Sequence, residues 1–166
     1  MNMTIRKLQA HDKQQLDALL KDVENYLPQP EFWLPVQQEA YDHFFDSAWT
    51  YFAGAFNGNN FIGAAALFFN EFEWGQSKQL LNLTTNSIAE FGRAMVQHNF
   101  RGKGVMGALS AHLLECARSL NIEYMVATVH PNNIASQKVL QKMGLEKQAE
   151  CVKECGYARS VYAMKL

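Results

Sequence analysis

A glycine-rich turn between a strand and a helix constrains this chain more than any other segment. Residues 101–107 read Arg-Gly-Lys-Gly-Val-Met-Gly; they follow the apolar stretch Ala94–Val96 and precede a helical pattern that continues to Leu120. Glycines have no Cβ, so the backbone can approach a ligand closely there. A helix that begins directly after such a turn presents unpaired N–H groups and the positive end of its dipole. The segment therefore predicts an anion site suited to a pyrophosphate.

Two widespread phosphate motifs do not account for this turn. A P-loop needs Gly-x4-Gly-Lys-Ser/Thr, and the sequence contains no such run. Gly102, Gly104 and Gly107 match the dinucleotide fingerprint Gly-x-Gly-x-x-Gly. That fingerprint also needs an acidic residue at the end of a second strand about 20 residues later, and here Glu123 begins a strand instead. A dinucleotide-binding domain is therefore disfavoured.

A second segment, His130–Leu145, follows the apolar strand Tyr124–Val129 and carries a further pattern. With it, the chain resembles the GCN5-related N-acetyltransferase (GNAT) superfamily, which has Arg/Gln-x-x-Gly-x-Gly/Ala at its pyrophosphate turn. The same family has an Asn that opens the next helix, and a Lys-x-Gly stop that ends it. The residues that match the two patterns are Arg101, Gly104, Met106, Leu109, Asn133, Ala135, Ser136, Lys142 and Gly144.

The hydrophobic periodicity gives an order of elements that fits this family over the whole chain, 1–166, as a single domain. The expected fold is α/β (α+β), with a GNAT-like mixed, mostly antiparallel sheet of about seven strands flanked by about four helices. Asn70–Asn86 is expected to be a long loop. The expected strands are Met3–Leu8, Thr50–Phe56, Phe61–Phe69, Ser87–Gln97, Tyr124–Val129, Leu145–Lys153 and Tyr157–Lys165, and the expected helices are Asp12–Val23, Gln37–Asp46, Val105–Leu120 and Asn133–Met143.

Local signals refine three of these elements. Asp12-Lys13-Gln14-Gln15 predicts a capping box at the first helix, and Asn57-Gly58 predicts a tight hairpin. The resemblance further implies that the strands 87–97 and 124–129 separate near their middle and expose main-chain groups to the pantetheine arm of coenzyme A.

The resemblance also implies the cofactor-binding residues. Met106 stands where the family has a small residue, although its amide remains available. Asn133 is expected to contact the cofactor arm, to act as the N-cap of its helix, or both. The residues expected to bind acetyl-CoA are Met95, Val96, Arg101, Gly102, Lys103, Gly104, Val105, Met106, Gly107, Asn133 and Ser136.

The general acid of many relatives is missing from this sequence. Those relatives place a Tyr seven residues after the helix-opening Asn, where its hydroxyl protonates the departing thiolate; here that position is Leu140. Relatives with Asn-x-Ala-Ser, including enzymes that acetylate protein N-termini, lack the Tyr as well. Ser136, Tyr157, Tyr162 or a water would have to serve, with Ser136 ranked first, or the thiolate leaves without assistance.

An amine acceptor also needs a base, because an ammonium group cannot attack a thioester. Glu90 is the candidate: it lies six residues before Val96, so regular alternation would place both side chains on one face of the strand. The position corresponds to the catalytic glutamate of histone-acetylating relatives. The alternatives are that Glu90 is an exposed strand-entry carboxylate, or that His98 is the base.

The acceptor itself is expected to meet the proline-rich loop Tyr26–Pro35, which walls the acceptor pocket in the resembled family. Phe32 and Trp33 are the candidate substrate contacts, with Trp33 the main one. Because this loop is aromatic, an acceptor with a hydrophobic portion beside its amine is favoured. The alternative is that Trp33 caps the core.

Composition excludes several other classes of protein. With 15 basic and 16 acidic residues there is no electrostatic case for nucleic acid or an anionic membrane. The odd number of cysteines, three, and the lack of an apolar leader argue against a secreted, disulfide-stabilised chain. The spacing of the cysteines argues against a metal site. We therefore expect a cytoplasmic, monomeric or homodimeric enzyme that uses acetyl-CoA and no metal to acetylate the primary amine of a small molecule. The alternatives are transfer to a protein N-terminus or lysine, and a coenzyme A-binding sensor without turnover.

Overall fold

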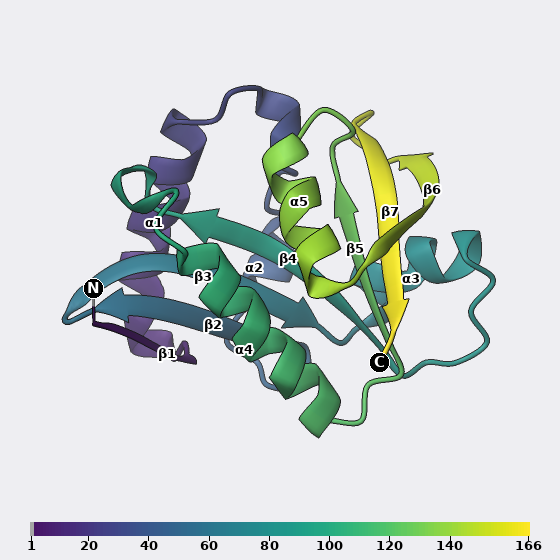
Figure 1. Cartoon of the computed structure of the whole chain (residues 1–166), viewed down its shortest axis with the longest axis horizontal. Coiled ribbons are helices and arrows are strands. Elements are labelled where there is room, and N and C mark those ends of the chain that lie inside the picture. The colour runs from purple at the N-terminus through teal and green to yellow at the C-terminus, as the bar shows by residue number, and fades with distance from the viewer. Residues whose placement is uncertain (1) are drawn as a thin grey trace.

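The computed structural model describes residues 2–166 and contains one seven-stranded sheet with strand order β1-β2-β3-β4-β5-β7-β6 (Figure 1). Only the β4–β5 pair is parallel; every other neighbouring pair is antiparallel. The predicted mixed, mostly antiparallel sheet is thereby confirmed. The strands are β1 Met3–Lys7, β2 Thr50–Asn57, β3 Asn60–Phe68, β4 Ile88–Val96, β5 Tyr124–Val129, β6 Glu146–Val152 and β7 Ala158–Lys165.

Five α-helices cover the two faces of this sheet. In Figure 1, α4 and α5 cross in front of the sheet and α1 and α2 lie behind it. The faces follow from the apolar positions of each helix: Leu109 and Leu113 of α4 pack in one buried cluster, and Leu16 and Leu19 of α1 in another. The helices are α1 Lys13–Asn25, α2 Gln38–Asp42, α3 Glu71–Leu80, α4 Val105–Ser119 and α5 Ile134–Met143.

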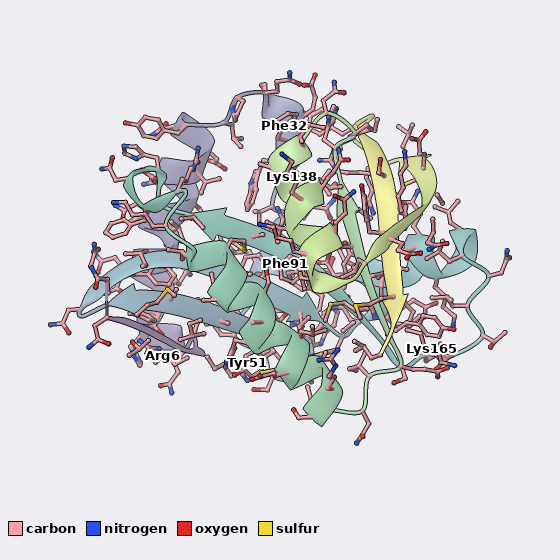
Figure 2. All side chains as sticks on the ribbon, viewed as in Figure 1. Arg6, Phe32, Tyr51, Phe91, Lys138 and Lys165 are labelled. Atoms are coloured by element: carbon pink, nitrogen blue, oxygen red, sulfur yellow. The ribbon has the colours of Figure 1, made fainter. Side chains whose placement is uncertain are left out.

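Side chains are distributed as this layering requires (Figure 2). Phe91 of β4 is 4% exposed and packs with the α4 side of the core, whereas Lys138 and Lys165 reach solvent. Each buried aromatic or aliphatic side chain of this kind stabilises the fold by about 1.5–3 kcal/mol relative to full exposure. The two buried clusters thus pack against the sheet on either side of the region where its central strands diverge.

The helix α3 lies where a loop was expected, so the prediction for Asn70–Asn86 is wrong over Glu71–Leu80. Asn70 is its N-cap and accepts a hydrogen bond from the Glu73 amide at 3.2 Å. The helix was difficult to recognise because it buries only Trp74 and Ser77. α2 is also shorter than the expected Gln37–Asp46.

The expected capping box at Asp12 is wrong as well. Asp12 precedes α1, but its carboxylate binds the Arg6 guanidinium, at 2.7 and 2.8 Å, and the Gln9 amide, at 2.8 Å. The carboxylate thus points back toward β1 instead of forward to Gln15. The hairpin prediction is confirmed: Asn57 pairs with Asn60, and Gly58 has φ +60°.

Strand β4 contains a bulge that changes which side chains share a face. Ala64 of β3 pairs with Met95 and Ala66 pairs with Gly92, so β4 holds one extra residue between these pairs. Arg93 lies in this extra length and has φ +49°. The side-chain alternation is therefore reversed beyond the bulge. Glu90 and Val96 consequently lie on opposite faces, and the prediction that they share one is wrong.

The central parallel pair separates after three residue pairs. Pairing between β4 and β5 joins Ile88–Tyr124, Ala89–Met125 and Glu90–Val126 and then stops, although both strands continue. The predicted separation of these strands is confirmed. Beyond Glu90 the facing edges of β4 and β5 leave main-chain N–H and C=O groups without sheet partners from each other.

Candidate functional site

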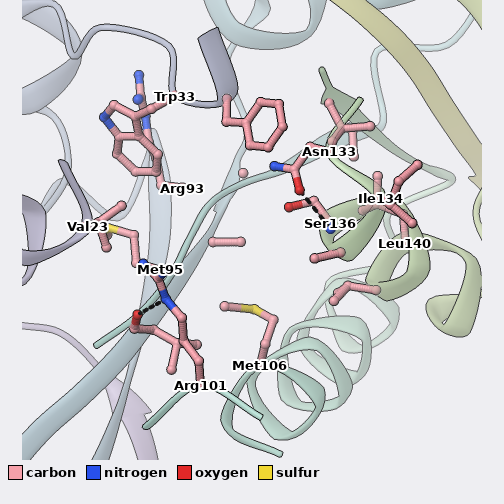
Figure 3. Close-up of a pocket in the computed structure, with 18 of the residues that line it drawn as sticks. Val23, Trp33, Arg93, Met95, Arg101, Met106, Asn133, Ile134, Ser136 and Leu140 are labelled. Atoms are coloured by element: carbon pink, nitrogen blue, oxygen red, sulfur yellow. Dashed lines mark hydrogen bonds between the residues drawn. The ribbon is translucent and has the colours of Figure 1, made fainter. Parts of the chain in front are cut away.

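A cavity of about 860 Å³ occupies the gap between β4 and β5 (Figure 3). One wall is β4 from Phe91 to Val96, and the facing wall is β5 from Ala127 to Val129. The glycine turn and the start of α4 close one end, and the loop that contains Phe32 and Trp33 closes the other. The predicted site residues on this cavity are Phe32, Trp33, Met95, Val96, Arg101, Gly102, Gly104, Val105, Met106, Gly107, Asn133 and Ser136.

The glycine turn has the geometry of an anion-binding helix start. Gly104 is the N-cap of α4 and has φ +82°, a left-handed conformation that disfavours any side chain. The first amide bonded within the helix is that of Ala108, to the Gly104 carbonyl at 3.1 Å, so the amides of residues 105–107 have no acceptor inside α4. Apart from its chain neighbours and the backbone of its own helix, no atom of residues 2–166 lies within 4 Å of a Cβ placed on Gly107. This end of the cavity is thus open to a negatively charged group.

The basic residues of the turn have two different positions. Arg101 donates from Nε to the Val96 carbonyl (3.3 Å) and from Nη1 to the Tyr26 carbonyl (3.2 Å). It therefore ties the turn to β4 and to the end of α1. Lys103 does not line the cavity; its ammonium lies 5.1 Å from the centre of the Phe100 ring.

The first turn of α5 extends the wall that β5 begins. Asn133 is the N-cap of α5, which was one of its two expected roles. Its Oδ1 accepts a hydrogen bond from the Ser136 amide at 3.2 Å. The Ser136 hydroxyl and the Asn133 side-chain nitrogen point toward the open centre of the cavity (Figure 3). Leu140, one turn further, is 3% exposed and closes the wall with an apolar surface.

The structure separates the candidate proton donors. Tyr162 is 2% exposed and donates from its hydroxyl to Gln137 Oε1 at 3.1 Å, outside the cavity wall. Tyr157 lies near the turn between β6 and β7 and does not line the cavity either. Of the three side chains named from the sequence, Ser136 is the one that lines it.

Arg93 fixes the loop that carries the aromatic residues. Its guanidinium lies 5.0 Å from the centre of the Trp33 ring, and its Nη1 donates to the Leu34 carbonyl at 2.6 Å. Trp33 is half-buried and its Nε1 is buried without a hydrogen-bond acceptor. Phe32 packs against the His130 ring, with centroids 5.3 Å apart. The loop thus presents a fixed aromatic edge to the cavity.

Glu90 lies at the vertex where the two strands begin to separate. It is 7% exposed, does not line the cavity, and its Oε2 has no hydrogen-bond partner. Its pKa is raised to about 8, and burial is the largest cause. The neighbouring Glu73 raises the pKa further, whereas Lys153, Arg93 and Thr128 lower it. Arg93 and Thr128 both line the cavity, so they connect it to Glu90.

His98, the alternative base, has other partners. Its Nδ1 lies 2.7 Å from Asp22 Oδ1, its amide donates to Asp22 Oδ2 at 2.8 Å, and its ring stacks on Tyr26 at 3.8 Å. His98 is not among the cavity-lining residues. The geometry therefore assigns it to holding the end of α1 against the glycine turn.

Arg93 and Thr128 were missed in the sequence analysis. The signal for Arg93 was present, since Gly92-Arg93 interrupts an otherwise apolar strand, but its role depends on the bulge. Thr128 lies inside an apolar strand and shows no distinguishing pattern.

Two negative findings apply to residues 2–166. No helix in this part of the chain is long and apolar enough to cross a membrane. No three His, Cys, Asp or Glu side chains there are grouped so that they could hold a metal ion.

Comparison with known proteins gives matches in both sequence and structure. L-2,4-diaminobutyric acid acetyltransferase from Halalkalibacterium halodurans is 39% identical over 61 residues, which are 36% of this chain and 32% of that enzyme. The match thus spans about a third of the curated relative.

Two solved structures share the fold at low identity. Ribosomal-protein-alanine N-acetyltransferase from Brucella melitensis has a TM-score of 0.74 and 22% identity, with 98% of this chain and 99% of that one covered. The structure of yncA from Salmonella typhimurium with its cofactor acetyl-CoA has a TM-score of 0.74 and 17% identity, with 100% and 95% covered. The sequence profile of the acetyltransferase (GNAT) domain matches residues 2–146, and this chain belongs to that family.

Proposed function

We propose that this protein transfers the acetyl group of acetyl-CoA to the primary amine of a small molecule by direct attack in a ternary complex. The observation that carries the proposal is the continuous cavity through the gap between β4 and β5, with an anion-binding turn at one end and an aromatic edge at the other. One ligand can enter from each end, and the two can meet near Arg93 and Thr128, the lining residues whose charge or hydrogen bonding acts on Glu90. The diaminobutyric acid acetyltransferase match supports a small amine as the acceptor.

The residues at the α4 end fit coenzyme A. The amides of Val105, Met106 and Gly107 would hold the pyrophosphate, and the unpaired edge of β4 up to Val96 would hydrogen-bond the pantetheine arm. Asn133 and Ser136 would face the thioester end from α5. Bound there, acetyl-CoA supplies an acetyl group activated as a thioester.

The chain's own groups then position the amine and move its proton. The ammonium group loses a proton to Glu90 through a water beside Thr128, and the free amine attacks the thioester carbonyl carbon. A new C–N bond forms and the C–S bond breaks. The attacking nitrogen then loses its second proton; Ser136 donates a proton to the leaving sulfur and regains one from that nitrogen through water. No cysteine lines the cavity, which supports direct transfer over an acyl-enzyme.

The test is thiol release from acetyl-CoA in the presence of a panel of primary amines, with mass analysis of the product. We expect release that depends on both the amine and the protein. Calorimetric binding of acetyl-CoA without turnover of any acceptor would instead identify a sensor module.

A peptide N-terminus is the second candidate acceptor. Two observations favour it. The chain shares its fold with a ribosomal-protein-alanine N-acetyltransferase. It also has the Asn-x-Ala-Ser pattern at Asn133–Ser136, with Leu140 in place of a Tyr. Peptides that begin with alanine, compared with free amines at equal concentration, distinguish the two: a higher kcat/KM for the peptide would support this candidate.

A further inference from the structure

Arg159 is a buried cation without an anionic partner. It is 2% exposed, and among residues 2–166 its side chain makes one hydrogen bond, from Nη1 to the Ala158 carbonyl at 2.7 Å. No ion pair joins it to a carboxylate of the described residues. Since a buried guanidinium without a counter-charge is strongly unfavourable, some other group is expected to supply the negative charge.

The strand register places Arg159 near the acceptor end of the cavity. Ala163 of β7 pairs with Val126, which pairs with Glu90, so these three share one face of the sheet. By alternation Arg159 lies on that same face. It is one residue beyond the last β5–β7 pair, Val129–Ser160, at the open end of the gap between β4 and β5.

Cations outnumber carboxylates in this region. Arg93 and Lys153 accompany Arg159, and Glu73 and Glu90 oppose them. Burial raises the pKa of both carboxyls, and that of Glu90 reaches about 8, so this carboxyl is largely neutral at pH 7. Burial lowers the pKa of Arg159. The groups that raise this pKa are Cys155, Cys151 and Tyr157, and none of the three is a carboxylate. The excess charge is therefore positive.

The pyrophosphate cannot supply this missing anion. Its proposed site is the start of α4, which packs on the opposite face of the sheet from Glu90, Val126 and Ala163. The acceptor, in contrast, enters past Trp33 and Arg93, and Arg93 is close enough to Arg159 for their charges to interact.

We propose that the acceptor carries a carboxylate as well as its amine, and that Arg159 binds this carboxylate while the amine faces Glu90. Tyr157, at the turn between β6 and β7, lies 5.8 Å from the Arg159 guanidinium and covers it. Because Arg159 does not line the cavity in this structure, binding of the carboxylate requires Tyr157 and its turn to move aside. The substrate class is thus an amino acid with a free amine, and this inference rests on the proposed acetyl transfer.

Matched amine pairs test the proposal on the wild-type protein. The pairs are 2,4-diaminobutyrate with 1,3-diaminopropane, and ornithine with putrescine; each pair differs only by the carboxylate. We expect kcat/KM to be higher for the carboxylate member by a factor of about 10–100, the usual effect of a charge-assisted hydrogen bond. Failure of every amine to react would overturn the proposed function, whereas equal rates within both pairs would overturn this inference alone.

The variant Arg159→Met tests whether Arg159 is the source of the preference for acceptors with a carboxylate. We expect the variant to lose the difference within each pair and to keep its rate with the diamines. Because the substitution removes an unpaired buried charge, its melting temperature should equal or exceed that of the wild type. Arg118→Met, the same change at an exposed position of α4, is the control and should keep the preference. A purely structural Arg159 would give a lower melting temperature with the preference retained.

Discussion

At the scale of single residues, Glu90 decides how the proposed reaction depends on pH. Because its pKa is about 8, the basic carboxylate form accumulates as the pH rises through that value. We expect kcat/KM to rise to about pH 8 and then level off. Glu90→Gln should lower kcat by roughly 10²–10⁴ and abolish the rise, with acetyl-CoA affinity unchanged. Steady-state rates across pH and calorimetric titration measure both quantities.

Glu115→Gln is the matched control, since Glu115 is exposed on α4 and does not line the cavity. It should reproduce the wild-type profile. If Glu90→Gln turned over normally at neutral pH, Glu90 would not be the base. Water would then be the base that remains, because His98 is held by Asp22.

Trp33 both packs against Arg93 and lines the cavity. Its ring lies under the Arg93 guanidinium, and its Nε1 is buried without an acceptor. Trp33→Phe keeps an aromatic ring near Arg93 and removes part of the ring surface that lines the cavity, so we expect KM for the amine to rise several-fold while the melting temperature and acetyl-CoA affinity stay nearly constant. If Trp33 only caps the core, Trp33→Ala would lower stability by an amount approaching the roughly 3–5 kcal/mol typical of buried aromatics, without a change in KM.

At the scale of elements, the start of α4 offers a substitution that should disturb the ligand and not the protein. Gly107 is exposed, has helical neighbours, and a Cβ there meets no atom within 4 Å. Gly107→Val should therefore fold normally and reduce acetyl-CoA binding by at least about tenfold, because the side chain projects where the pyrophosphate is proposed to lie. Gly104 is less suitable, since φ +82° makes any side chain strained there.

Ala111→Val, one turn further along α4 and exposed, is the comparison for Gly107→Val. Calorimetric titration of both variants with coenzyme A should give wild-type affinity for Ala111→Val alone. If a well-folded Gly107→Val protein bound coenzyme A with unchanged affinity, the assignment of the pyrophosphate site to this turn would be wrong.

The elements differ in how far the sequence predicts them. Helix α4 has Leu109 and Leu113 on one buried stripe, and its periodicity is sufficient. Helix α3 has Gly75 at its centre and only Trp74 and Ser77 buried, so neither propensity nor periodicity identifies it. The bulge at Arg93 is equally hidden, because it depends on how β3 pairs with β4. That one extra residue invalidated the argument that placed Glu90 and Val96 on the same face.

At the scale of the whole molecule, the cavity joins segments that are far apart in the sequence. The glycine turn and the Asn133 helix start could be predicted because each is a local pattern with its own geometry. Arg159 could not: the side chain is charged, on a strand near the end of the chain, and typical of a solvated position. Its burial depends on what packs against one face of β7, where Tyr157 and Arg93 lie near it, and no local pattern shows this.

The stability of the whole molecule should depend on pH through carboxyls whose pKa values shift in opposite directions, downward for Asp12 and upward for Glu90 and Glu73. Hydrogen bonding to Arg6 lowers the pKa of Asp12 from its ordinary 3.8, so its contribution is present above that value and is lost as the pH falls further. Burial raises the pKa of Glu90 from 4.5 to about 8, so the folded state binds a proton more tightly than the unfolded chain, and stability declines as the pH rises between those values.

We therefore expect the melting temperature to be highest on the acidic side of neutrality, near about pH 5, and to decline toward pH 8. Asp12→Asn should flatten the acid limb, because the variant has no carboxylate to protonate. Glu90→Gln should flatten the decline above pH 5 and be more stable than the wild type at pH 8. Thermal unfolding of the three proteins across pH measures both limbs. A wild-type maximum at or above pH 8 that Glu90→Gln leaves unchanged would show that the Glu90 carboxyl is hydrated, and the proposed pH dependence of catalysis would lose its basis as well.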